Sequence, residues 1–152
     1  MAIEAPVSKF KKNNLKIYIV ICLVLATWFA YDGYLNKKFI EKHTEDGEAN
    51  STLFFNQKSP PFFVGGALLL VAYLYAIKNK KLIADDNELI ISDRKRITYS
   101  SIQRINKTYF DSKGFFTIIY KNKSGREVSY KLHNRAYDNL SAVLDYIVAE
   151  IT

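Results

Sequence analysis

The stretch "PPFFVGGALLLVAYLYAIKNKK", which runs from Pro60 to Lys81, decides the fold class of this chain. From Phe62 to Ile77 it holds 16 residues without a charge, and no polar residue recurs at the spacing that gives a helix a wet face. This run makes about 24 Å of helix, and a bilayer core is about 30 Å thick. Flanking lysines can extend the span by snorkelling, and prolines suit the first turn of a helix. The stretch therefore predicts a transmembrane helix over residues 61–78.

A second apolar run, "LKIYIVICLVLATWFAYDGYL", spans Leu15 to Leu35 and lacks any charge between Ile17 and Tyr31. Aromatic residues lie near the ends of both runs, where membrane interfaces favour them. Two such runs in 152 residues predict a transmembrane hairpin, with its first helix over residues 15–35. The lysines before Leu15 also resemble the basic front of a signal peptide, but we interpret the run as a retained anchor.

The distribution of lysine predicts how the hairpin lies in the membrane. Lysines precede the first run and directly follow the second, whereas the connection between the runs holds four lysines and five acidic residues. The positive-inside rule places both termini in the cytoplasm, which makes the chain an integral protein of the inner (cytoplasmic) membrane. Lysines beside anionic headgroups account for the net charge of +7, so nucleic acid is not expected as a partner. The predicted parts are a cytoplasmic tail (1–14), transmembrane helices (15–35 and 61–78), an outer-side loop (36–60) and a cytoplasmic domain (79–152).

The residues from Leu82 onward predict a small antiparallel β domain. Short strand-like segments alternate with turn signals, and residues 127–133 alternate between polar and apolar as in a strand with one buried face. Gly114 and Gly125 stand where hairpin loops need a positive φ. The segment "YSSIQRIN" interrupts this pattern and predicts a single helical turn. The predicted strands are "LIAD", "ELIIS", "KRITY", "NKTYF", "FFTIIYKN" and "REVSYKLH".

The chain ends in an apolar stripe with helical spacing, which predicts an amphipathic helix over Leu140–Ile151. Asp138 or Asn139 is expected to cap its start. A lone helix with such a stripe must bury it, and the preceding sheet is the obvious partner. The predicted fold class is α+β, a two-helix transmembrane hairpin plus an antiparallel β domain of six to seven strands closed by this helix. The stripe comprises Leu140, Val143, Leu144, Ile147, Val148 and Ile151.

This order of elements resembles the bacterial pleckstrin-homology-like domain. The likeness rests on the turn "I-x-Y-S-S-I-x-x-I" after the third strand and on the closing helix, and it covers most of residues 79–152. In that family such domains often follow a pair of membrane spans, so the resemblance extends over most of the chain. It implies a binding platform, although a fold alone does not fix a function. The positions that carry it are Ile97, Tyr99, Ile102, Ile105, Gly114, Tyr120, Leu132 and the Leu140–Ile151 helix.

Residues that support catalysis or metal binding are few. The sequence has no glycine-rich phosphate loop, no paired Cys or His spacing and no G-x-S-x-G. The predicted membrane separates His43, which lies among acidic residues of a solvated loop, from His133. Cys22, the only cysteine, lies in the first predicted helix and is interpreted as a small packing residue. We therefore expect a chain that is not an enzyme, with no catalytic residue, no metal site and no cofactor.

Small residues indicate where the predicted helices pack. A small-x-x-x-small spacing allows close approach in lipid, and it serves either the hairpin itself or a neighbouring subunit. No ionisable residue lies in the middle of either run, which argues against an ion or proton pathway. The predicted helix-packing residues are Ala26, Ala30, Gly65, Gly66, Ala72 and Ala76.

Two functions from different classes fit these features. The first is a non-catalytic accessory or scaffolding subunit of a larger membrane complex, with integral membrane protein subunits and membrane lipids as partners. The alternative is a binder of anionic lipid headgroups, or of another anionic ligand, through the basic cluster Arg94, Lys95 and Arg96. Surface charge is screened within about 8 Å at physiological salt. We therefore expect helix packing, and not this cluster, to carry attachment to the partner.

Overall fold

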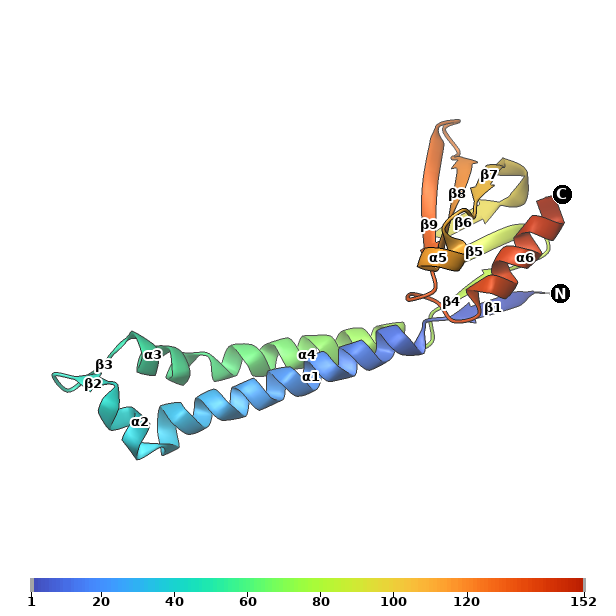
Figure 1. Ribbon diagram of the computed structural model, residues 1–152. Coiled ribbons are helices and arrows are strands. Elements are labelled where there is room, and N and C mark those ends of the chain that lie inside the picture. Colours follow the sequence, from blue (N-terminus) through green and yellow to red (C-terminus); the bar gives the residue numbers. More distant parts are fainter. Residues whose placement is uncertain (1, 152) are drawn as a thin grey trace. The chain divides into compact units, whose positions relative to one another are not determined.

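The computed structural model describes residues 2–151 and divides the chain into two compact units. One unit joins the N-terminal segment up to Lys12 with the residues from Ala76 onward, and the other runs from Asn13 to Tyr75. The structure combines two long apolar helices with antiparallel sheets (Figure 1), which confirms the predicted α+β class.

Most of both long helices belongs to the second unit. Helix α1 (Lys9–Ala30) runs into a π-helical turn, η1 (Tyr31–Leu35), and helix α4 (Pro60–Ile77) begins at the two prolines, as predicted. The helical segments Lys9–Leu35 and Ser51–Ile77 are long and apolar enough to cross a membrane. In the most apolar 18-residue stretch of each segment, only 6% and 11% of the residues are buried, whereas a core helix of a soluble protein is mostly buried.

Short helices and strands connect the long helices, in the segment 36–60 that was predicted as an outer-side loop. The side chain of Asn36 accepts a hydrogen bond from Phe39 N (3.3 Å), and that of Asn50 accepts one from Leu53 N (3.1 Å). Each asparagine thus caps a short helix that apolar periodicity does not reveal. The connecting elements are helix α2 (Lys37–Lys42), strands β2 (Thr44–Glu45) and β3 (Glu48–Ala49), and helix α3 (Ser51–Lys58).

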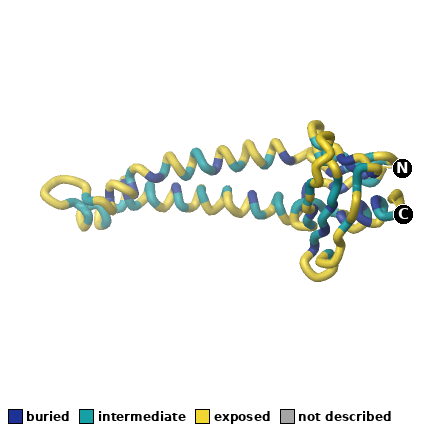
Figure 2. The backbone as a smooth tube through the Cα atoms, turned by 90° about the horizontal axis from the view of Figure 1, so that it is seen from above, coloured by how far each residue is buried: buried dark blue, intermediate teal, exposed yellow. Residues whose placement is uncertain are grey.

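The helices of the second unit pack through small and aromatic residues. The Phe29 ring centroid lies 5.5 Å from those of Phe55 and Phe63, and Ala26 and Ala67 are buried. Many larger apolar residues of these helices are exposed, and Figure 2 shows exposed positions along both helices. The exposed set includes Val20, Val24, Trp28, Leu68, Leu69 and Tyr75.

Seven strands of the first unit form two antiparallel sheets. One sheet has four strands in the order β1-β4-β5-β6, and the other has three in the order β7-β8-β9. Five of the six predicted strand segments correspond to β4, β5, β6, β8 and β9. The strands are β1 (Ile3–Pro6), β4 (Lys81–Ala84), β5 (Glu88–Ser92), β6 (Lys95–Thr98), β7 (Ile102–Asn106), β8 (Phe115–Lys121) and β9 (Glu127–His133).

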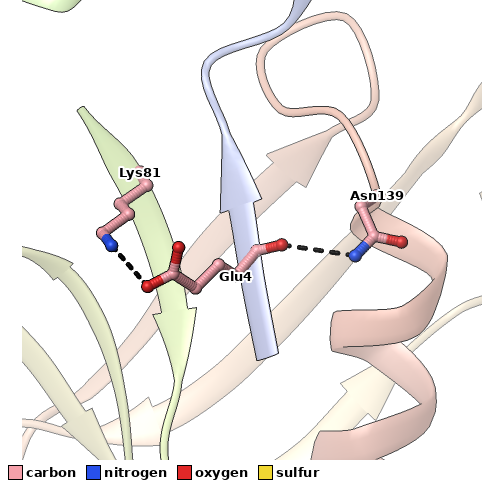
Figure 3. Close-up of polar contacts among 3 residues, drawn as sticks. All are labelled: Glu4, Lys81 and Asn139. Atoms are coloured by element: carbon pink, nitrogen blue, oxygen red, sulfur yellow. Dashed lines mark hydrogen bonds and ion pairs between the residues drawn. The ribbon is translucent and has the colours of Figure 1, made fainter. Parts of the chain in front are cut away.

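Strand β1 comes from the segment predicted as a tail. It pairs with β4 over the full length of both strands, from Ile3 opposite Ala84 to Pro6 opposite Lys81. Glu4 binds neighbours on both sides (Figure 3), because its side chain pairs with Lys81 and its backbone oxygen accepts a hydrogen bond from Asn139 (3.2 Å). The N-terminal residues are therefore an edge strand of the domain.

The structure corrects the prediction for residues 99–110. The predicted strand "NKTYF" is a turn that leads into a short helix, α5 (Phe110–Lys113), because Asn106 Oδ1 accepts a hydrogen bond from Thr108 N (3.1 Å). The predicted helical turn is the 3₁₀ turn η2 (Tyr99–Ser101), and strand β7 follows it at once. Ile102 and Ile105 have the spacing of residues on one face of a helix, but a register shift between Ile102 and Arg104 lets residues three apart face the same side of a strand.

One apolar core joins both sheets to the C-terminal helix α6 (Leu140–Ile151), whose bounds match the prediction. Leu144 and Ile147 are buried as expected, while Ile151 at the helix end is 40% exposed. The two expected caps bind the N-terminal segment instead, since Asp138 accepts a hydrogen bond from Lys9 N (3.0 Å) and Asn139 binds Glu4. The buried core is formed by Ala5, Leu82, Ala84, Leu89, Ile97, Tyr99, Phe116, Ile118, Leu132, Leu140, Val143, Leu144 and Ile147.

Candidate functional site

The predicted basic cluster, Arg94 to Arg96, does not converge on one point. The ammonium of Lys95 lies 3.7 Å from the ring centroid of Tyr130, and Arg96 Nη1 donates to Glu88 Oε1 at 2.8 Å. Successive residues of a strand face opposite sides of the sheet, so these two side chains diverge. Arg94, in the turn between β5 and β6, lines a pocket.

Arg94 shares this pocket with two lysines that sequence reasoning left out of the cluster. Because β4 and β5 are antiparallel, Lys80 and Lys81 at the start of β4 lie beside the end of β5, which Arg94 follows. The pocket, here called the β4–β5 pocket, has a volume of about 430 Å³. Its remaining lining residues are Asn79, Ile83, Ile90, Ile91, Ser92 and Asp93.

An irregularity in β5 gives the β4–β5 pocket an apolar floor. The pairing of β5 with β6 shifts register between Ile90 and Ser92. As a result Ile90 and Ile91 both line the pocket, although neighbours in a regular strand face opposite sides. Ile83 lies opposite Ile90 across the β4–β5 pair and completes the floor.

The rim of the β4–β5 pocket has a positive balance, because it holds three basic residues and one acidic residue, Asp93. Lys81 also pairs with Glu4 just outside the lining (Figure 3), but both side chains are about half exposed, at 43% and 51%. An ion pair in water contributes at most about 1 kcal/mol, so Lys81 can turn to another anion. Lys80 and Arg94 are exposed, and together the three side chains suit a negatively charged ligand.

The residues beside both long helices are hydrogen-bonded within the first unit. Ser8 is fully buried, donates to Arg135 O, and accepts a hydrogen bond of 3.1 Å from the first turn of α1, which it thereby caps. Lys80 N donates to Ile77 O, and Lys80 O accepts from Val7 N, both at 3.1 Å. The lining of the β4–β5 pocket therefore begins at Asn79, two residues after the last residue of α4.

Two tyrosines lie on the side of the domain formed by the β4–β5 turn and α6. Partial burial and a hydrogen bond to Asp86 (3.0 Å) raise the pKa of Tyr146 to about 12. Burial raises the pKa of Tyr99 further, and its hydroxyl is buried without a hydrogen-bond partner among the described residues.

A polar network lies in the second unit, around η1 and the end of α3. Trp28 Nε1 and Asn36 Nδ2 donate to the carboxylate of Asp32 at 2.9 and 2.8 Å, and Gln57 Nε2 donates to Gly33 O at 3.1 Å. A Cβ at Gly33 would lie 2.9 Å from a backbone oxygen of α3, so this close approach requires glycine. The sequence pattern indicated interfacial aromatic residues in this region. It did not indicate the hydrogen-bond network, because Gln57 reaches Gly33 from a different helix.

The predicted helix-packing residues fall into two groups. Ala26 is buried and Ala30, Gly65 and Gly66 are half-buried, whereas Ala72 and Ala76 are exposed. Ala26 and Ala30 also line a groove of about 580 Å³ in the second unit, together with Tyr34, Pro60 and Val64. Sequence reasoning missed Ala67, which is 3% exposed, because no small residue stands four positions from it.

Comparison with protein-family models, with curated proteins and with solved structures gives no significant match to this chain.

Proposed function

We propose that the chain is a non-catalytic, membrane-anchored interaction protein that serves as an accessory or scaffolding subunit of a larger membrane protein complex. The observation that carries this proposal is the exposure of large apolar side chains along both long helices. Leu68 and Leu69, for example, are 65% and 74% exposed. Soluble monomers rarely expose large contiguous apolar patches, whereas lipid and neighbouring spans would cover this surface. Each helical segment has 27 residues, or about 40 Å, which exceeds a bilayer core of about 30 Å.

The pairing of β1 with β4 supports a hairpin with both ends on one side. Residues 3–6 precede the first long helix and residues 81–84 follow the second, yet they form one antiparallel pair. Strands in one sheet must share a compartment, so the chain between them crosses the membrane an even number of times. The lysines at both junctions favour the cytoplasm as that compartment, and hence an inner-membrane location.

The strand arrangement supports the proposed likeness to a bacterial pleckstrin-homology-like domain. The resemblance implies seven strands and a closing helix, and the first unit has seven strands in sheets of four and three with α6 after them. In this chain the extra strand would be β1, contributed from before the hairpin. Such a domain would act as a platform for cytoplasmic partners of the complex.

Two features of the helices support docking against a neighbouring membrane subunit. Ala72 and Ala76 are both exposed and lie four residues apart on α4. Their small side chains form a strip where another helix can approach closely. The groove that contains Ala26 and Ala30 offers a second apolar recess of about 580 Å³. The basic cluster Arg94 to Arg96 offers fewer free contacts to a partner, because Lys95 already contacts Tyr130 and Arg96 already binds Glu88.

Cysteine labelling tests the topology. In a Cys22→Ala background, a membrane-impermeant thiol reagent should label Ser51→Cys in intact cells, because this residue would lie on the outer side. It should label Ser124→Cys only after lysis, because the turn between β8 and β9 would lie in the cytoplasm. Both positions are exposed, so accessibility within the fold does not bias the comparison. Labelling of Ser124→Cys in intact cells would contradict the hairpin with cytoplasmic ends.

Bulky substitutions test attachment to the complex. Ala72→Leu combined with Ala76→Leu should release the chain from its complex in mild detergent, because the added side chains prevent close helix approach. Co-purification followed by native gel electrophoresis and mass spectrometry measures the bound fraction. Ala72→Ser combined with Ala76→Ser keeps both residues small and should leave the complex intact.

A charge variant provides the opposing test. Replacing Arg94, Lys95 and Arg96 together by Gln should leave the chain bound, and 0.5 M salt should not strip it from the complex. Salt screens interactions between exposed charges, with a Debye length that falls to about 3 Å at 1 M, but it does not weaken the packing of apolar helices. Release by the charge variant but not by the leucine variant would favour electrostatic attachment over helix packing.

A further inference from the structure

We propose that the β4–β5 pocket binds the phosphate headgroup of an anionic phospholipid in the membrane leaflet that adjoins the end of α4. This inference goes beyond the subunit role and rests on one part of it, the insertion of the two long helices into a membrane. It moves the anionic-ligand contacts from the cluster Arg94 to Arg96 to Lys80, Lys81 and Arg94. Lys80 and Lys81 lie at the junction that leads into β4, Arg94 lies in the β5–β6 turn, and all three line one pocket.

The charges of the pocket suit a phosphate group. Lys80, Lys81 and Arg94 provide three cationic donors, and the lining residues Asn79 and Ser92 add neutral ones. Hydrogen bonds from charged donors to phosphate are stronger than neutral ones, and Arg can bind two phosphate oxygens at once. Glu4 pairs with Lys81, so a phosphate would compete with one exposed carboxylate for this ammonium group.

The floor and size of the pocket favour a lipid over free phosphate. Ile83, Ile90 and Ile91 offer apolar contact that inorganic phosphate cannot use, whereas the glycerol and first acyl carbons of a phospholipid can. The volume of about 430 Å³ lies within the range of ligand pockets and far exceeds the needs of a single small anion. An apolar floor beneath a cationic rim therefore matches a molecule that is itself amphipathic.

The position of the pocket along the chain places it at the membrane surface. Lys80 N is hydrogen-bonded to Ile77 O (3.1 Å), and the lining of the pocket begins at Asn79, two residues after the last residue of a helix proposed to end at the interface. The surface potential of anionic lipids attracts basic residues by about 1 kcal/mol each near the membrane and fades within a Debye length. Basic residues held this close to a span lie within that range.

Native mass spectrometry of the full-length chain in a mild non-ionic detergent tests the proposal. The purified chain is titrated with dihexanoyl phosphatidylglycerol or with dihexanoyl phosphatidylcholine, both kept below their micellar concentrations. We expect one phosphatidylglycerol to remain bound and phosphatidylcholine to bind at least about tenfold more weakly. Lys80→Gln with Arg94→Gln should weaken phosphatidylglycerol binding about tenfold or more, and Glu4→Gln should strengthen it because Lys81 is freed.

A charge-matched variant serves as the control. Lys95→Gln with Arg96→Gln removes the same charge from the adjacent strand β6 and should change the affinity by less than about threefold. An equal loss in both double variants would overturn the pocket in favour of general electrostatic attraction. Equal binding of the two lipids, or displacement of phosphatidylglycerol by equimolar glycerol 3-phosphate, would overturn the lipid headgroup as the ligand.

Two further measurements keep the test decisive. If Lys80→Gln with Arg94→Gln fails to fold, as judged by far-ultraviolet circular dichroism, Arg94→Gln alone should still weaken binding, because Arg94 lies in an exposed turn. Unchanged affinity in that variant would overturn the proposal. Failure of membrane insertion would instead be recognised earlier, since the chain would then purify from the soluble fraction without detergent.

Discussion

Replacing Ala5 by Asp is expected to destabilise the first unit by at least about 4 kcal/mol, because the substitution buries an unpaired carboxylate. Ala5 is 0% exposed and belongs to the same apolar core as Leu82 and Ile147, although the two long helices separate it from them in sequence. The charge would also prevent β1 from pairing with β4 and would leave the edge of β4 open. Amide hydrogen exchange of β4 and β5 in the full-length chain measures the effect.

Ala2→Asp is the matched control for this variant. Ala2 is exposed and carries the same substitution three residues earlier, so its effect should stay within about 0.5 kcal/mol. Equal protection of β4 in Ala5→Asp and in the unmodified chain would mean that β1 is dispensable. In that case residues 82–152 would form the domain without the N-terminal strand.

Replacing Phe116 by Ala should lower the free energy of unfolding of the first unit by about 3–5 kcal/mol. Phe116 is 0% exposed near the start of β8, lies opposite Leu132 of β9, and makes an edge-on contact with Phe110 at 5.7 Å between ring centroids. Its removal would leave a cavity that strands on both sides cannot close. Loss of amide protection in β8 and β9, measured in the full-length chain, reports the change.

The neighbouring Phe115 gives a matched control. It lies on the opposite face of the same strand, half-buried beneath the ammonium of Lys131, which is 3.4 Å from its ring centroid. Phe115→Ala removes the same side chain but should cost about 1 kcal/mol, because a solvent-facing site leaves little cavity. Similar losses at both positions would mean that the two faces of β8 are equally covered, for example by a partner.

Strong local patterns made much of the fold predictable. The helix at residues 60–77 follows from two prolines and an uninterrupted apolar run, and α6 follows from a stripe with a period of three to four residues. Strand β9 follows from a two-residue alternation, and β8 follows from the aromatic and β-branched run before the glycine turn, where Gly125 has a φ of +72°. In each case the signal lies within one segment, so it needs no knowledge of distant partners.

The parts that were missed depend on contacts between distant segments. Strand β1 is only four residues long and includes Pro6, so nothing in "IEAP" indicates a strand until β4 lies beside it. The β4–β5 pocket was missed for the same reason, since Lys80 and Arg94 meet only through antiparallel pairing. The adjacency of Arg94, Lys95 and Arg96 in sequence was misleading, because strand geometry sends neighbouring side chains to opposite faces.

The pairing of β1 with β4 has a consequence for the biogenesis of the chain. During synthesis β1 leaves the ribosome before both long helices, while its partner emerges only after them, so the sheet must wait for the whole hairpin. If the hairpin inserts as proposed, the two strands meet on one side of the membrane and the sheet closes. A chain with its ends on opposite sides would keep an open strand edge and an incomplete core, which are features that promote aggregation and proteolysis. Closure of this one strand pair would thus act as a checkpoint by which misinserted chains are eliminated.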